Sequence, residues 1–184
     1  GFAGQLGIYS DDLLDGHRRL AAAIRAHGSL AVLQLHHAGM RSPHELIEGP
    51  PVCPSADDKT GARSLSLDEV HRLRDDFIEA AVRCQRAGYD GVEVHGAHGY
   101  VLCQFLSTET NRRRDAYGGS LENRARLIHE IIADFRSLVV KHPDTRCVGD
   151  QDPAVSQLER TLGSERTTDS QNLVFILVKN GNKG

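Results

Sequence analysis

The amino-acid sequence predicts a parallel α/β architecture, either a doubly wound sheet or a barrel. Helix-like and strand-like segments alternate up to Pro143, in the order helix, strand, helix, strand, helix. The first strand-like run, residues 30–35, is almost continuously apolar, as expected for a strand that is covered on both faces, and residues 89–94 are interpreted as a second buried strand. The chain has 184 residues, which is enough for one domain with a substantial core.

The first helix is expected from Asp11 to His27. Its apolar stripe returns every three or four residues, and Gly28 supplies a stop signal. The run LAVLQL, residues 30–35, follows as the first strand. Residues 36–65 are rich in proline and glycine, which favours a loop.

The second helix is expected to open at a capping box, in which Ser66 and Glu69 bond each other's backbone N–H groups. Gly88 ends this helix, and residues 89–94 form the second strand. Ser120 caps a third helix, which Pro143 terminates. The stripe of the second helix consists of Val70, Leu73, Phe77, Ala81, Cys84 and Ala87.

The character of the chain changes after Pro143. A third strand is due there, but residues 146–150 offer only two apolar side chains, and residues 151–172 are polar with weak periodicity. A β-prone run, residues 173–178, stands near the end. We therefore predict two parts, an α/β segment over residues 1–143 and a divergent tail over residues 144–184, which is disordered or foreign to the fold.

Composition argues against several classes of protein. The net charge of −3 gives no reason to expect a nucleic-acid partner, and the apolar run near the end is too short to span a bilayer. The four cysteines match no common zinc spacing, and the N-terminus carries no secretory signal. We therefore expect a cytoplasmic protein with reduced thiols. The sequence leaves homo-oligomer formation open.

Polar side chains gather where the second strand ends. In GVEVHGAHGY, residues 91–100, Glu93 and His95 share one face of the strand, while His98 and Tyr100 follow in the loop. Ligands bind at the carboxyl ends of the strands in barrels and open α/β sheets. Gln34 takes the matching place near the end of the first strand, with two further histidines just beyond it.

Three interpretations of these histidines compete. They can be hydrogen-bonded structural residues, or ligands of a metal, or part of an organic active site. The H-x-x-H spacing in a loop fixes no third ligand, so a metal site is the weakest of the three and we assign no metal. In an organic site, two imidazole N–H groups would bind a carbonyl or nitro oxygen while Tyr100 supplies a proton.

The segment HGAHGY is followed by NRRRDAYGGSLENR, a long and specific combination, and GQLGIYSDD and LQLHHAG precede it. In these segments and in their order, the sequence resembles the Old Yellow Enzyme family of NADH:flavin oxidoreductases and ene-reductases. The resemblance covers roughly residues 4–138. It implies part of a TIM-type (β/α)₈ barrel, roughly from its second helix through its fourth, with an atypical C-terminal tail.

The resemblance also implies cofactors and roles for individual residues. FMN would be the cofactor and NAD(P)H the reductant, with hydride passing through the flavin to an α,β-unsaturated carbonyl or nitro compound. His95 and His98 match the pair that binds the substrate oxygen, Tyr100 matches the proton donor, and Gln34 matches an amide that contacts the flavin ring.

Part of the family's barrel has no counterpart in this sequence. The resemblance begins after the first strands and ends before those that hold the flavin phosphate. The family's H-A-G-R reads His37-Ala38-Gly39-Met40 here, with Arg41 one place late. The sequence therefore leaves open whether the chain is itself an enzyme. The alternative is a truncated, non-catalytic fragment that does not bind FMN alone.

Overall fold

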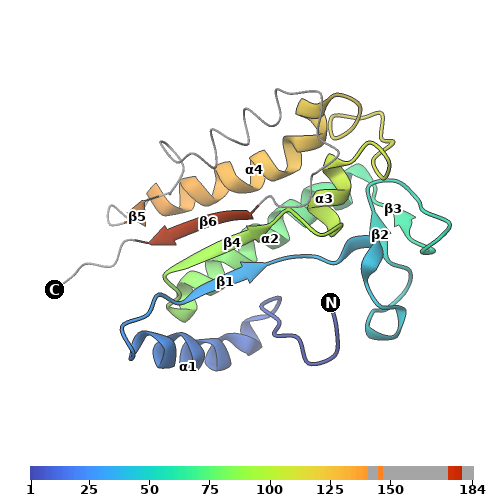
Figure 1. Ribbon diagram of the computed structural model, residues 1–184. Coiled ribbons are helices and arrows are strands. Elements are labelled where there is room, and N and C mark those ends of the chain that lie inside the picture. The colour runs from blue at the N-terminus through green and yellow to red at the C-terminus, as the bar shows by residue number, and fades with distance from the viewer. Residues whose placement is uncertain (141–144, 147–173, 180–184) are drawn as a thin grey trace.

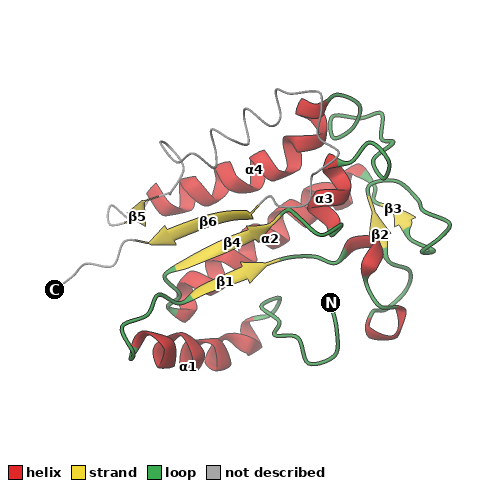
Figure 2. Ribbon diagram, viewed as in Figure 1, coloured by secondary structure: helices red, strands yellow, loops and turns green. Residues whose placement is uncertain are grey.

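The computed structural model describes residues 1–140, 145–146 and 174–179, with side chains described up to residue 135. Helices and strands alternate over most of this chain (Figures 1 and 2). The larger elements, in chain order, are α1 (Leu14–Arg25), β1 (Val32–Leu35), α2 (Leu67–Ala87), β4 (Gly91–His95), α3 (Val101–Leu106), α4 (Leu121–Val140), β5 (Thr145–Arg146) and β6 (Val174–Lys179).

Three short 3₁₀ helices and two very short strands make up the remaining regular structure in the described part of the chain. They are η1 (Asp11–Leu13), η2 (Gly39–Arg41), η3 (His44–Leu46), β2 (Val52–Cys53) and β3 (Arg63–Ser64). Apart from η1, which precedes α1, they lie within residues 36–65 and were not predicted. Strands β2 and β3 pair in parallel as a separate small sheet.

The main sheet has the strand order β1–β4–β6–β5. Strands β1 and β4 are parallel, and Gln34 lies opposite Glu93 in their register. This parallel pair, with α2 as its connection, confirms the predicted β/α architecture. Strand β6 runs antiparallel along the other edge of β4, with Ile176 opposite Glu93, and β5 follows antiparallel to β6.

Strand β6 lies within residues 144–184, the segment that the sequence predicts to be a divergent tail. The β-prone run near the end of the chain forms a strand of the main sheet, shifted by one residue from the prediction. In a (β/α)₈ barrel all strands are parallel, so an antiparallel neighbour of β4 departs from that pattern. Apart from the two residues of β5, the rest of the tail lies outside the described residues, and its separate origin stays a prediction.

Helix α2 covers one face of the β1–β4 pair, with α1 packed on one side of it and α4 on the other (Figure 1). Val92 and Val94 of β4 and Leu35 of β1 are buried in the core, as expected for side chains under helices. The opposite face carries Gln34, which is exposed, and Glu93, which is half-buried. The core residues from the helices include Val70, Leu73, Phe77 and Cys84 of α2, and Leu127, Ile131 and Phe135 of α4.

Helix α2 forms as its sequence predicts. Ser66 Oγ accepts a hydrogen bond from the Glu69 amide at 3.2 Å, and the Glu69 carboxylate accepts one from the Ser66 amide at 2.8 Å, which completes the capping box. Gly88 ends the helix in the left-handed conformation, with φ of 88°. The turn after α2 leads into β4, so this helix fixes where the histidine-bearing strand begins.

Candidate active site

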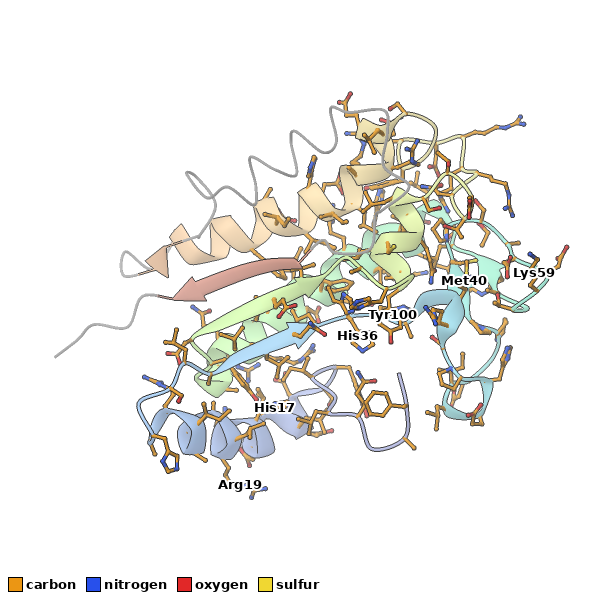
Figure 3. All side chains as sticks on the ribbon, in the orientation of Figure 1. His17, Arg19, His36, Met40, Lys59 and Tyr100 are labelled. Carbon is orange, nitrogen blue, oxygen red and sulfur yellow. The ribbon has the colours of Figure 1, made fainter. Side chains whose placement is uncertain are left out.

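The predicted residues lie at the carboxyl ends of the two parallel strands. His95 is the last residue of β4, and the loop that follows carries His98 and Tyr100, the residue before α3. Residues 36–41 follow β1 on the same side. Figure 3 shows His36 and Tyr100 close together beyond the end of β1. The structure therefore brings residues from two loops together at the carboxyl ends of β1 and β4.

His95 and His98 form a hydrogen-bonded pair. Their ring centroids are 5.0 Å apart, and His95 Nε2 lies 3.1 Å from His98 Nδ1. The Ala97 amide donates to His95 Nδ1 at 3.2 Å, so that nitrogen is the acceptor of the neutral ring. The proton of His95 is therefore on Nε2, which donates to His98 Nδ1, and the proton of neutral His98 is on Nε2.

This tautomer has a consequence for ligand binding. His98 is exposed, and its Nε2–H bonds nothing in the described part of the chain, whereas the Nε2–H of His95 is directed at its neighbour. An incoming oxygen can accept from His98 directly. It can accept from both rings only when it replaces the bond between them.

Tyr100 completes the cluster. Its ring centroid is 5.1 Å from that of His95 and 4.9 Å from that of His36. The side chain is half-buried, and among the described residues nothing hydrogen-bonds its hydroxyl group. The phenol is thus held by ring contacts while its O–H stays available to a ligand beside the imidazole pair.

Gln34 stands apart from this cluster. Its Nε2 donates to Glu93 Oε1 at 2.6 Å, across the pairing of β1 with β4. It lies on the open face of the sheet, whereas His95, on the same face of β4, is only 5% exposed. Glu93 was not predicted as a site residue. Its alternation with His95 and its register with Gln34 are the signals that indicate this position.

His36 is the main residue that the sequence did not assign. Its ring centroid lies 4.9 Å from that of Tyr100 and 6.0 Å from that of His95, and Gln5 Nε2 lies 2.5 Å from its Nε2. Its Nδ1 is buried and has no hydrogen-bond partner among the residues that the structure describes. The two histidines after the first strand signalled its region, but the contact with Gln5, 31 residues earlier, has no local signal.

Burial lowers the pKa of three imidazoles around the site, those of His36, His37 and His95. Desolvation lowers the pKa of His95, and the neighbouring His98 lowers it further, while Glu93 opposes the shift. Desolvation likewise lowers the pKa of His36, with smaller contributions from the N-terminal ammonium group and His95. Burial, aided by His36, lowers the pKa of His37 to about 4. Neutral rings are hydrogen-bond donors through one nitrogen only, as the tautomers above require.

Within the described residues, no group of three or more His, Cys, Asp or Glu side chains is arranged to hold a metal ion. In the same part of the chain, no helix is both long and apolar enough to cross a bilayer.

A family model decides the relationship of the chain to known proteins. The model of the NADH:flavin oxidoreductase / NADH oxidase family matches residues 1–148. The chain belongs to this family. An NADPH dehydrogenase of Halalkalibacterium halodurans is 42% identical over 136 residues, which are 72% of this chain and 39% of that protein. A probable NADH-dependent flavin oxidoreductase of Bacillus subtilis is 40% identical over 145 residues, 77% of this chain and 39% of that protein.

Solved structures of the family agree with the fold. Morphinone reductase superposes with a TM-score of 0.69 at 36% identity, over 75% of this chain and 42% of that one. The Old Yellow Enzyme homologue of Zymomonas mobilis gives 0.67 at 36% identity, over 71% and 41%. The predicted partial (β/α)₈ barrel of the Old Yellow Enzyme family is therefore confirmed. The chain spans about two fifths of the length of these relatives.

The family's cofactors are those that the sequence predicts, FMN with a nicotinamide reductant. The residues present fit the polar edge of a flavin ring. Gln34 offers an amide on the open face of the sheet, beside the Glu93 carboxylate, and the buried Nδ1 of His36 lacks a partner within the described part of the chain. None of the four predicted site residues is a lysine or an arginine, so a cationic partner for the FMN phosphate has to come from other residues.

Proposed function

We propose that this chain provides the substrate end of an FMN-dependent site that reduces activated alkenes at the expense of NAD(P)H. The substrate class is a small α,β-unsaturated carbonyl or nitro compound, and the setting is cytoplasmic. The observation that carries the proposal is the Tyr100 hydroxyl, without a partner in the described chain and beside a neutral His95–His98 pair.

Each residue has a distinct role in this proposal. His98 donates its Nε2–H to the substrate oxygen, and His95 does the same once that oxygen replaces the bond between the rings. Two donors withdraw electron density from the conjugated double bond, so its β-carbon becomes electrophilic. Tyr100 donates a proton to the α-carbon. Gln34 would hold the polar edge of FMN, which when bound supplies the hydride-transfer chemistry.

Removing one hydroxyl group tests the role of Tyr100. Tyr100→Phe keeps the ring contacts with His36 and His95 but removes the proton. We expect alkene reduction to slow by about 10²-fold or more, the usual contribution of a positioned acid, while oxidation of the nicotinamide by the flavin continues unchanged. Stopped-flow absorbance separates the two half-reactions.

Tyr9→Phe is the matched control, because Tyr9 is 80% exposed and distant in sequence from the cluster. Its two half-reactions should equal those of the unmodified chain. If Tyr100→Phe slowed both half-reactions equally, Tyr100 would not be the proton donor.

The alternative, a fragment that does not bind FMN alone, is favoured by the span of about two fifths of the relatives' length. Titration with FMN distinguishes the two functions. A yellow chain whose flavin absorbance bleaches when NADH or NADPH is added supports an enzyme. A chain that stays colourless after titration and gel filtration supports the fragment.

A further inference from the structure

Arg41 connects the two loops that form the site. It ends η2 in the loop after β1, and its Nη1 donates to the carbonyl oxygen of His98 in the loop after β4 at 2.7 Å. Its guanidinium carbon lies 5.8 Å from the centre of the Tyr100 ring, within the range of a cation–π contact. One exposed side chain thus contacts the backbone of one site residue and the ring of another.

The turn that Arg41 holds has an unusual backbone. His98 has φ of 56° and Gly99 has φ of 68°, so two successive residues are in the left-handed region. For a residue with a Cβ atom that conformation is strained and persists only where its surroundings enforce it. A Cβ atom on Gly99 would lie 3.2 Å from Arg41 Nη1, so the guanidinium packs closely against this turn.

Gln104 of α3 holds the His98–Gly99 turn as well, through hydrogen bonds of its side chain. It is 2% exposed, its Nε2 donates to the Gly99 carbonyl at 2.7 Å, and its Oε1 accepts from the Met40 amide at 3.2 Å. The carbonyl groups of His98 and Gly99 are therefore both engaged, one by Arg41 and one by Gln104. Gln104 is buried within the fold, whereas Arg41 is exposed. Of the two residues that hold this turn, Arg41 is therefore the one to substitute.

We propose that Arg41 is a positioning residue, which fixes the His98–Gly99 turn and thereby sets the Tyr100 ring against the His95–His98 pair. Its role in turnover rests on the function proposed above, whereas its role in the geometry does not. In this proposal Arg41 acts through His98 and Tyr100, and it contacts neither the substrate nor the cofactor. A guanidinium suits this role, because its planar fork can donate to a carbonyl and lie over a ring at the same time.

The geometric part can be tested without flavin. Amide and aromatic NMR spectra of the full chain are compared for Arg41→Ala, Arg41→Lys and Arg19→Ala. Arg19 is a matched control, because it lies on α1 and points away from the sheet (Figure 3). We expect the Gly99 amide and Tyr100 ring resonances to shift in Arg41→Ala, to shift less in Arg41→Lys, and to stay in place in Arg19→Ala.

Unchanged Gly99 and Tyr100 resonances in a folded Arg41→Ala chain would overturn the proposal. If that variant does not fold, the Arg41→Lys spectrum decides by the same two resonances. In the FMN-loaded chain, we expect kcat for alkene reduction to fall about tenfold or more in Arg41→Ala, because small misplacements of reacting groups are costly. Arg41→Lys should recover part of this loss, and the nicotinamide half-reaction should not change.

These two measurements separate the inference from the proposed function. If the chain shows no turnover but the resonances shift as expected, the function fails and the positioning role stands. If turnover is present and Arg41→Ala alters both half-reactions equally, the loss is not specific to Tyr100, and the positioning role fails.

Discussion

Burial lowers the pKa of His36, His37 and His95, and protonation decides which of their ring nitrogens donate. His37 shows the effect most clearly. Its Nδ1 accepts a hydrogen bond from the Gly39 amide at 3.0 Å, which requires that nitrogen to be unprotonated. The pKa of about 4 follows from burial of the ring, with the neighbouring His36 adding to the effect. The loop after β1 is therefore built around a neutral imidazole.

This histidine makes stability depend on pH. Its folded pKa lies below the unfolded value of 6.5, so the unfolded chain binds the proton more readily between these values. The contribution is complete above pH 6.5 and is lost as the pH falls toward 4, by at most about 3 kcal/mol. Urea unfolding at a series of pH values measures it. The lowered pKa values of His36 and His95 act in the same direction.

His37→Asn is the matched variant, because its Oδ1 can replace Nδ1 as the acceptor of the Gly39 amide but does not titrate. We expect the unfolding free energy of this variant to fall less steeply between pH 6.5 and 4 than that of the unmodified chain. Equal slopes in the two proteins would show that the titration of His37 does not control stability in this range.

Elements with local signals were predicted from the sequence, and elements that depend on distant contacts were not. Helix α2 has a capping box, a periodic stripe and a terminal glycine, and its bounds match the prediction. Helix α3 has only six residues, all of them buried, and therefore no amphipathic period. It is held by its surroundings, as by the amide of Val101, which donates to the His37 carbonyl at 3.0 Å.

The same distinction applies to the site. The strand-end positions of His95, His98 and Tyr100 follow from alternation and family resemblance, and the structure brings these residues together. The roles of Gln5, Arg41 and Gln104 depend on contacts between loops that are far apart in sequence. Such contacts leave no periodic pattern, so they require coordinates.

The capping box offers a test at the level of one helix. Ser66→Ala removes the acceptor of the Glu69 amide, and we expect the unfolding free energy to fall by about 1 kcal/mol. Ser66→Asp keeps an acceptor at this position and should retain most of the stability. Chemical denaturation of the three proteins measures both differences. Equal losses in the two variants would show that the hydrogen bond itself is not what stabilises the start of α2.

The two parallel strands of the main sheet differ in how their sides are covered. Strand β1 pairs with β4 on one side only within the described residues, and β4 is covered on its far side by β6. Five residues of β4, from Gly91 to His95, have partners in β6. Uncovered strand edges expose backbone N–H and C=O groups that recruit other chains. Strand β6 therefore protects the strand that carries the site.

Two truncations test this role of β6. A chain that ends at residue 173 lacks β6, whereas a chain that ends at residue 179 keeps it. We expect the shorter chain to form larger species in light scattering and to unfold at a lower temperature, because the β4 edge loses its backbone partners. The longer chain should match the full one in both measurements. If both truncated chains stay as monodisperse and as stable as the full chain, β6 does not contribute to the sheet, and β4 needs no partner on that side.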